Sequence, residues 1–233
     1  MTASRFALFF VPAADSPLYQ FGQSVLGYDC YSRTETMFPS DLPLTNAGWM
    51  DLTSQPRRYG FHATLKAPFH LKPDTSAEKI AEKFRAYAAS VTTSPEIDVS
   101  LGLLDDFIAI MPRKPSPPLN QLAAQCVAAF DSFRAPLGQE ERGRRMQTRL
   151  SLREAGNLER WGYPYVFEDF RFHMTLTGPI DAADREIVLD YLRSLFHDAH
   201  GIRPIRIDRL CLVRQDWPSA RFHVIEQAGL GKA

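Results

Sequence analysis

The sequence predicts a mixed fold of helices and strands, built as two similar lobes related by a pseudo-two-fold axis. The first observation is a repeated octapeptide, FHATLKAP at 61–68 and FHMTLTGP at 172–179, near the middle of each half of the chain. The second is the expected order of elements, because each copy is a strand followed by a helix and two further strands. The third is the length of 233 residues, which favours a single bilobal domain over 1–233.

The elements of the first half begin with an apolar run, Arg5–Val11, which predicts a buried strand. A loose helical periodicity follows over Ser16–Leu26. The next segment, 27–58, has no clear period, and such a long irregular stretch is expected to face the substrate. The remaining elements are a helix opened by a capping box at Thr75 and Glu78, and strands around Ile97–Leu103 and Phe107–Met111.

The second half begins after a proline-rich connector, and a linker with a basic insertion is expected over about 112–160. Within it, Leu119–Phe130 has the periodicity of an amphipathic helix. The arginine-rich stretch 139–160 predicts either a helical face exposed to solvent or a basic flap over an anionic ligand. The remaining elements are a helix capped by Asp181 and strands around Ile205–Val213 and Arg221–Gln227.

The charge balance excludes some classes of function. The chain has 27 basic and 27 acidic side chains, which argues against a long nucleic-acid track or an acidic membrane surface as the main partner. The apolar run at the N-terminus is too short for a signal sequence or a membrane span. The three cysteines have neither a metal-binding nor a paired spacing, so reduced thiols in a cytoplasmic protein are expected.

Polar and apolar side chains alternate through both octapeptides. His62 and Thr64 are two residues apart, as the histidine and threonine of the second copy are, and residues at this spacing share one face of a strand but diverge on a helix. On a strand the histidine and the threonine sit about 6 to 7 Å apart along the chain, a spacing that suits the binding of one phosphate group. The candidate substrate-binding residues are Thr64, Thr175, the nearby cations Lys66 and Arg171, and Tyr59.

The two histidines of the motifs, His62 and His173, are the candidate catalytic residues. Because an imidazole titrates near neutral pH, one can be neutral and the other protonated in the same site. The neutral imidazole would deprotonate an attacking water, and the protonated one would donate to the leaving oxygen. The threonine hydroxyls and the cations would stabilise the charge on the phosphate oxygens. This scheme implies no metal and no other cofactor.

The paired motifs resemble those of the 2H phosphoesterase superfamily, and the YGFHATLKAPF segment is similar to its DUF1045-like bacterial branch, found beside phosphonate-utilisation genes. The superfamily implies a bilobal α+β fold, with two antiparallel sheets lining a central groove and helices outside. It implies metal-independent cleavage of cyclic phosphates, in which His173 activates water and His62 protonates the leaving oxygen. The branch implies a sugar substrate, 5-phosphoribosyl 1,2-cyclic phosphate, opened to a ribose bisphosphate.

Three alternatives remain open at this point. The first is a 2′,3′-cyclic phosphodiesterase for nucleotides or a short RNA end, since neutral charge disfavours only a long RNA track. The second is a nucleotide- or RNA-binding module without turnover. The third is a structural protein whose histidines are satisfied core residues. Two further features are ambiguous: Arg57 and Arg58 either contact an anion or are solvated, and His70 either binds substrate or occupies a loop or edge position.

Overall fold

The computed structural model describes residues 4–147 and 149–231. Within these ranges most strands form one seven-stranded antiparallel sheet in the order β11-β10-β1-β4-β8-β7-β6. The predicted α+β class and its antiparallel strands are confirmed. The strands are β1 (Arg5–Phe10), β4 (Ala63–His70), β6 (Val99–Leu104), β7 (Phe107–Pro112), β8 (Met174–Thr175), β10 (Arg209–Gln215) and β11 (His223–Gly229).

The sheet has two wings that meet at the two motif strands. One wing is β11-β10-β1-β4, the other is β8-β7-β6, and a single residue pair, Ala63 with Met174, joins them. The two sheets expected from the resemblance are therefore continuous through this pair. A second feature differs from the prediction as well, because β8 spans only Met174–Thr175 and not the whole octapeptide.

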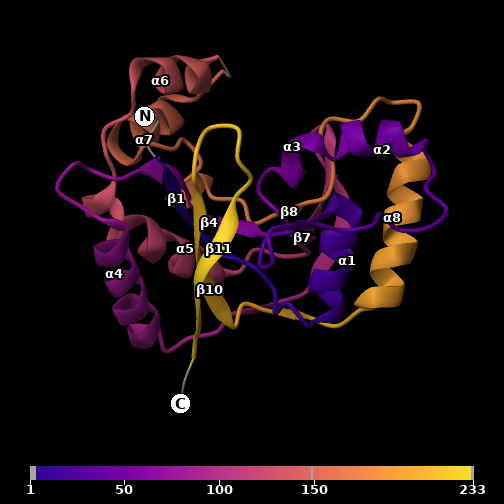
Figure 1. Ribbon diagram of the computed structural model, residues 1–233, viewed down its shortest axis with the longest axis horizontal. Helices are drawn as coiled ribbons and strands as arrows, with labels where there is room; N and C mark the ends of the chain where they lie inside the picture. The colour runs from indigo at the N-terminus through magenta and orange to yellow at the C-terminus, as the bar shows by residue number, and fades with distance from the viewer. Residues whose placement is uncertain (1–3, 148, 232–233) are drawn as a thin grey trace.

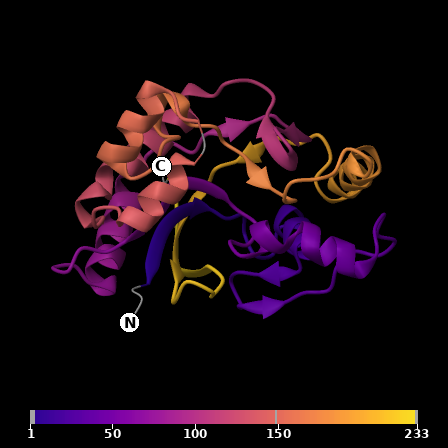
Figure 2. The same ribbon diagram turned by 90° about the horizontal axis from the view of Figure 1, so that it is seen from above.

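Helices lie alongside both wings, as expected (Figure 1). The helices α4 (Ala77–Ser90) and α5 (Pro117–Ala129) pack on the first wing, against β10, β11 and β4. The helix α8 (Arg185–Ala199) packs on β6 of the second wing and against α1 (Pro17–Leu26). Figure 2 shows the same separation from above, with α8 far from the helices of the first wing.

The predicted pseudo-symmetry corresponds to a repeated order of helices and strands along the chain. The first half runs β1, α1, β4, α4, β6, and the second half runs β7, α5, β8, α8, β10. In each half the first helix and the last strand belong to the opposite wing, so the halves are interlocked. The short strands β5 (Glu96–Ile97) and β9 (Ile205–Arg206) occupy matching places and pair with each other. The repeat therefore begins one strand earlier than the sequence predicted.

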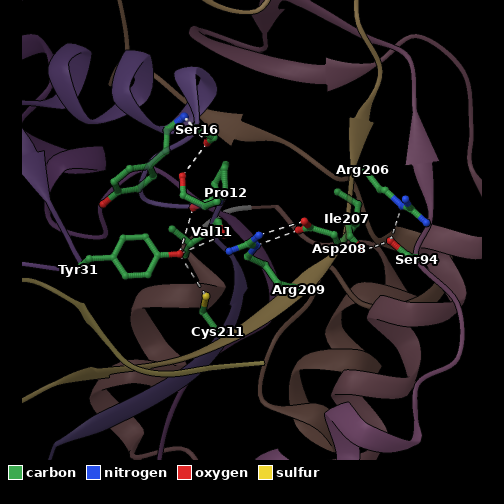
Figure 3. Close-up of polar contacts among 12 residues, drawn as sticks. Val11, Pro12, Ser16, Tyr31, Ser94, Arg206, Ile207, Asp208, Arg209 and Cys211 are labelled. Carbon is green, nitrogen blue, oxygen red and sulfur yellow. Dashed lines mark hydrogen bonds and ion pairs between the residues drawn. The ribbon is translucent and has the colours of Figure 1, made fainter. Parts of the chain in front are cut away.

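The junction around β9 is held by side chains from both halves (Figure 3). The hydroxyl of Ser94, just before β5, donates to the carbonyl of Ile207 and accepts from the guanidinium of Arg206. The phenol of Tyr31 donates to the carbonyl of Pro12 at 3.1 Å, which fixes the chain where it leaves β1. The two bonds of Ser94 connect segments more than a hundred residues apart, so they join the two halves at this junction.

The remaining segments are short and surround the end of the sheet that carries the motifs. The irregular stretch 27–58 contains two small strands and two short helices, and the arginine-rich stretch contains two helices. These elements are β2 (Tyr28–Asp29), β3 (Thr34–Glu35), α2 (Asn46–Leu52), α3 (Ser54–Arg57), η1 (Asp131–Phe133), α6 (Gln139–Met146), α7 (Leu152–Trp161) and η2 (Phe167–Asp169).

Two predicted helix starts are displaced by a few residues. The cap of α4 is Ser76, whose hydroxyl accepts from the backbone amide of Lys79, whereas the hydroxyl of Thr75 donates to the carbonyl of Lys72. The cap of α8 is Asp184, three residues after the predicted one, because Asp181 begins a turn that precedes the helix. No helix within the described ranges has both the length and the apolar character needed to span a membrane.

Candidate functional site

The two motifs lie side by side in the sheet. Ala63 and Met174 are antiparallel partners, and in an antiparallel pair the residue after one partner lies opposite the residue before the other. Thr64 therefore lies opposite His173, and His62 lies opposite Thr175. Each histidine has the threonine of the other motif as its cross-strand neighbour, so the two motifs form one composite site.

These four side chains line one cavity, which has a volume of about 660 Å³. We call it the arginine cavity, because four guanidinium groups also line it. Its walls come from the motif strands, β1, α6, the residues around α3 and the loop between β10 and β11. The lining side chains are Arg5, Gln55, Arg58, Tyr59, His62, Thr64, Ala67, Pro68, His70, Glu140, Glu141, Arg144, Arg145, Tyr163, His173, Thr175, Gln215 and Pro218.

Both imidazoles are oriented by the same backbone contact. The Nδ1 of His62 lies 2.8 Å from the carbonyl oxygen of Gly60, and the Nδ1 of His173 lies 2.8 Å from that of Arg171. A carbonyl oxygen can only accept, so each Nδ1 carries a proton and donates. The Nε2 of each ring is then the atom with the free lone pair, available as a base. The two half-sites thus present the same tautomer.

A glycine turn makes this contact possible in the first motif. Gly60 has a φ of +73°, a left-handed conformation that a side chain disfavours. A Cβ atom at this position would also lie 2.8 Å from the Cβ of Cys30. The turn directs the carbonyl of Gly60 back towards the His62 ring.

The hydroxyl of Thr64 completes the surroundings of His62. Its Oγ1 lies 3.1 Å from the Nε2 of His62. Because the ring proton is on Nδ1, the hydroxyl donates and the Nε2 accepts in the ligand-free protein. A phosphate oxygen that accepts the same hydroxyl proton would leave the Nε2 lone pair available for proton transfer.

Burial keeps both imidazoles neutral in the ligand-free protein. The pKa of His62 is lowered to about 4, chiefly by burial and in part by nearby His173, while the Gly60 carbonyl opposes the shift. Burial also lowers the pKa of His173, with Arg171 adding to the effect and the Arg171 carbonyl and Asp105 opposing it. Strongly shifted pKa values in a concave site are typical of functional residues.

Aromatic rings supply much of this burial. The ring of Phe9, on β1, stacks on the His62 ring with 3.8 Å between centroids. Tyr59 lies 5.9 Å from His62 and stacks on Phe222 at 5.1 Å. Tyr59 was expected among the substrate-binding residues, and the structure places it in the wall of the arginine cavity.

Lys66 does not reach the arginine cavity, contrary to the expectation from alternation. Phe9 pairs with Thr64 but Leu8 pairs with Lys66, so the strand contains a bulge with one extra residue at Leu65. This bulge moves Lys66 to the face opposite Thr64. A second register shift, between Leu8 and Phe6, returns the end of the strand with His70 to the cavity side. The ammonium group of Lys66 is buried, donates to the carbonyl of Val127 at 2.9 Å and lies 3.6 Å from Asp131.

Arg171 lies in a second pocket that adjoins the arginine cavity. This aromatic pocket has a volume of about 400 Å³ and shares Thr64, Ala67, Tyr163 and His173 with the arginine cavity. Its aromatic lining consists of Phe107, Tyr163, Tyr165, Phe167 and Phe170. Arg171 is exposed in it, next to His173 and on the same side as Asp105. Arg171, the predicted cation of the second motif, therefore lies in the same pocket as His173, whereas the other arginines line the arginine cavity.

Of the four arginines that line the arginine cavity, three were candidates from the sequence and one was not. Arg5 reaches the arginine cavity from β1, and Arg144 and Arg145 reach it from α6. Of the ambiguous pair, Arg58 lines the cavity, whereas Arg57 is buried and donates to the carbonyl of Leu26. A basic segment beside the site was predicted for 139–160, but Arg5 has no sequence signal. In Figure 1, α6 lies on one side of the β10–β11 hairpin and α3 lies on the other.

Comparison with known proteins gives the family. A family model described as "Protein of unknown function (DUF1045)" matches residues 64–223, more than half of the chain. The chain belongs to the DUF1045 family. This membership confirms the branch that the YGFHATLKAPF segment predicted. The DUF1045 match includes most of the first motif and all of the second.

Two relatives of this DUF1045 chain carry the name ribose 1,5-bisphosphate phosphokinase PhnN. The one from Janthinobacterium sp. (strain Marseille) is 37% identical over 223 residues, which are 94% of this chain and 49% of the relative. The one from Laribacter hongkongensis (strain HLHK9) is 33% identical over 180 residues, which are 77% of this chain and 41% of the relative. The chain therefore spans about half the length or less of these curated relatives.

The solved structures that resemble the DUF1045 chain are remote in sequence. Escherichia coli LigT complexed with NADP+ is 14% identical, with 99% of each chain covered and a TM-score of 0.42. The conserved protein ATU0111 from Agrobacterium tumefaciens str. C58 is 12% identical, with 96% of this chain and 85% of that chain covered and a TM-score of 0.45.

Proposed function

We propose that this chain is a metal-independent phosphoesterase that hydrolyses the cyclic phosphodiester of a small sugar phosphate, with 5-phosphoribosyl 1,2-cyclic phosphate as the favoured substrate. The observation that carries the proposal is the composite site: both histidines and both threonines of the motifs line one cavity with four arginines. Imidazoles that present a free Nε2, hydroxyl donors and guanidinium groups are the components that phosphoester hydrolysis requires.

The negative charge of the bound substrate would set the protonation states of the two imidazoles. In the ligand-free protein both pKa values are lowered, so neither imidazole is protonated near neutral pH. A bound phosphodiester brings a negative charge next to both rings and raises both pKa values. One ring then takes up a proton and the other stays neutral, which is the combination that acid–base catalysis needs.

The reaction itself is a hydrolysis with two proton transfers. The neutral imidazole accepts a proton from water at Nε2 while the water oxygen forms a bond to phosphorus. The bond from phosphorus to one ester oxygen breaks, and the protonated imidazole donates its Nε2 proton to that oxygen. The product is a phosphomonoester with a free hydroxyl on the sugar, and the threonine hydroxyls donate to the phosphate oxygens throughout.

The environment of the rings favours His62 as the base and His173 as the acid, the reverse of the roles that the resemblance implies. His62 stacks on Phe9 and has its pKa lowered to about 4. The charges of Arg171 and Asp105 have opposing effects on the pKa of His173. When a phosphate binds, the less strongly buried imidazole of His173 is the one expected to take up the proton first.

The names of the relatives support a ribose phosphate as the substrate class. Ribose 1,5-bisphosphate, which those names give as the kinase substrate, is a ribose with two phosphate groups. Opening the cyclic ester of 5-phosphoribosyl 1,2-cyclic phosphate also yields a ribose with two phosphate groups. A protein that joined the two activities would therefore handle closely related sugars.

The aromatic pocket favours a second candidate, a nucleotide 2′,3′-cyclic phosphodiesterase. Five aromatic rings beside His173 and Thr64 would stack on a nucleobase whose phosphate lies between the motifs. One of these rings belongs to Phe167, whose φ of +55° is strained for a bulky residue. Strained residues cluster at ligand sites, so this loop suits a binding role.

The test is a hydrolysis screen by phosphorus NMR in the presence of EDTA. It compares 5-phosphoribosyl 1,2-cyclic phosphate with the four nucleoside 2′,3′-cyclic phosphates, using the wild type, His62→Ala and His173→Ala. Histidine-dependent opening of the sugar substrate supports the proposal, and opening of the nucleotides alone supports the second candidate. Turnover of none of them, with the fold intact, would contradict both and indicate a binding module.

A further inference from the structure

A row of polar side chains crosses the first wing of the sheet and faces the arginine cavity. Arg5 on β1 is the antiparallel partner of Gln215 on β10 and of His70 on β4. Residues directly opposite each other across a sheet point to the same face, and all three side chains line the cavity. The row is therefore a fixed part of the sheet and not a set of mobile loop residues.

Arg5, at the centre of the row, is held in place by neutral groups. Its Nε donates to the Oε1 of Gln215 at 2.8 Å. The amide of Gln215 is buried and donates to the carbonyls of Pro218 and Ala220 at 3.2 and 2.7 Å. The guanidinium also lies over the ring of Phe222, 5.4 Å from its centroid. These contacts orient the guanidinium but leave its charge without a carboxylate partner among the described residues.

Two further arginines add positive charge beside Arg5. Arg58 comes from the end of α3, and Arg144 comes from α6. Among the described residues neither side chain makes a hydrogen bond or an ion pair. Burial lowers the pKa of Arg5, Tyr59 and Glu141 oppose this shift, and the like charges of Arg58 and Arg144 add to it. The like charges of Arg58 and Arg144 are unfavourable for the Arg5 guanidinium, and a bound anion would relieve this repulsion.

The acidic residues of the arginine cavity do not neutralise this group. The carboxylate of Glu141 pairs with Arg145 at 2.6 Å, and Arg145 also donates to the carbonyl of Gly162. Glu140 is exposed, and the arginines therefore remain in excess. In a chain with zero net charge, such an excess in one cavity indicates an anionic ligand.

The arginine group is separate from the place where the reaction would occur. Phe9, which stacks on His62, is four residues along β1 from Arg5, and a rise of about 3.3 Å per residue puts their Cα atoms about 13 Å apart. The arginine side chains nevertheless line the same cavity as the two histidines. A ligand that contacts both places needs two anionic groups joined by a short linker.

We propose that Arg5, Arg58 and Arg144 bind a second phosphate group of the substrate, so that the site selects cyclic phosphodiesters that also carry a terminal phosphomonoester. Guanidinium groups match phosphate oxygens in shape and charge, and they often bind them in pairs of hydrogen bonds. The inference rests on the proposed function for the identity of the reacting group. It adds the residues that would distinguish a phosphorylated sugar from an unphosphorylated one.

The test measures substrate preference in three variants. Arg58→Gln and Arg144→Gln remove one guanidinium each, and Arg142→Gln is the matched control. Arg142 lies on the same helix as Arg144, pairs with Glu159 at 2.6 Å and does not line the arginine cavity. The two substrates are 5-phosphoribosyl 1,2-cyclic phosphate and ribose 1,2-cyclic phosphate, which lacks the 5-phosphate. The preference is the ratio of the two kcat/KM values.

We expect the wild type and Arg142→Gln to prefer the phosphorylated substrate strongly. In Arg58→Gln and Arg144→Gln the preference falls on the order of tenfold to a hundredfold, which is the usual effect of removing a hydrogen bond between charged groups. An unchanged preference in both variants, or an equal decrease in Arg142→Gln, would overturn the inference. Arg144 is exposed, so its replacement leaves the core packing intact.

A binding measurement separates this inference from the proposed function. Calorimetry with ribose 5-phosphate, which has the terminal phosphate but no cyclic ester, needs no turnover. Weaker binding by the two cavity variants, with the affinity of Arg142→Gln unchanged, supports the second phosphate site even if the wild type opens neither cyclic substrate. Absent binding to the wild type, or equal binding by all variants, would refute it.

Discussion

Replacing His62 by glutamine should remove part of the pH dependence of folding stability. Burial lowers the pKa of His62 from an ordinary value of 6.5 to about 4. Between these values the unfolded chain binds a proton that the folded protein does not, so stability falls as the pH decreases through this range. Linkage over this shift gives a loss of about 2 kcal/mol between pH 7 and pH 5.

The assay is urea unfolding of the wild type and His62→Gln at the two pH values. Other histidines contribute to the pH dependence of both proteins, and the difference between the two proteins isolates His62. The wild type should lose about 2 kcal/mol more than the variant on going from pH 7 to pH 5. His197 on α8 is exposed, and His197→Gln serves as the control that behaves as the wild type. An equal loss in the wild type and His62→Gln would refute the conclusion that the His62 ring is buried and neutral.

Two further predictions concern pH. Burial lowers the pKa of Lys66 from 10.5 to about 8, so between these values the unfolded chain binds a proton that the folded protein does not. The stability of the wild type should therefore rise by about 2 kcal/mol from pH 8 to pH 10. Lys66→Met should abolish this rise. Urea unfolding of both proteins checks this, and the same rise in the variant would contradict it. The optimum of kcat/KM should lie at lower pH than the optimum of kcat, because the substrate charge raises both imidazole pKa values in the complex. Initial rates across the acid range measure this, and coinciding optima would count against it.

Much of the fold could be predicted because its signals are local. The period of two in the octapeptides, the apolar run before Pro12 and the helical period after Ser76 each depend on a few neighbouring residues. The placement of β6 and β10, the last strands of the two halves, in the opposite wing could not be predicted in this way. The pairing of β5 with β9 and of β1 with β10 joins residues more than a hundred positions apart.

For the candidate site, the sequence indicated the two motif histidines but not which cations lie beside them. Repetition indicated His62 and His173, because two octapeptides rarely match at five positions by chance. Alternation failed for Lys66, because the bulge at Leu65 is set by the pairing with β1 and leaves no mark in the octapeptide. Arg5 is part of an apolar strand signal, and only the register with β10 and β4 brings it to the arginine cavity.

The most direct test of the central claim is a rate comparison in which the two histidines are removed singly and together. We expect His62→Gln and His173→Gln each to lower kcat for 5-phosphoribosyl 1,2-cyclic phosphate on the order of a hundredfold to ten-thousandfold. The double variant should be about as slow as the slower single variant, because residues that act as one unit are not additive. Thermal melts should show that all three variants fold. Near wild-type rates, or losses in rate that follow losses in stability, would contradict the account of a paired catalytic site.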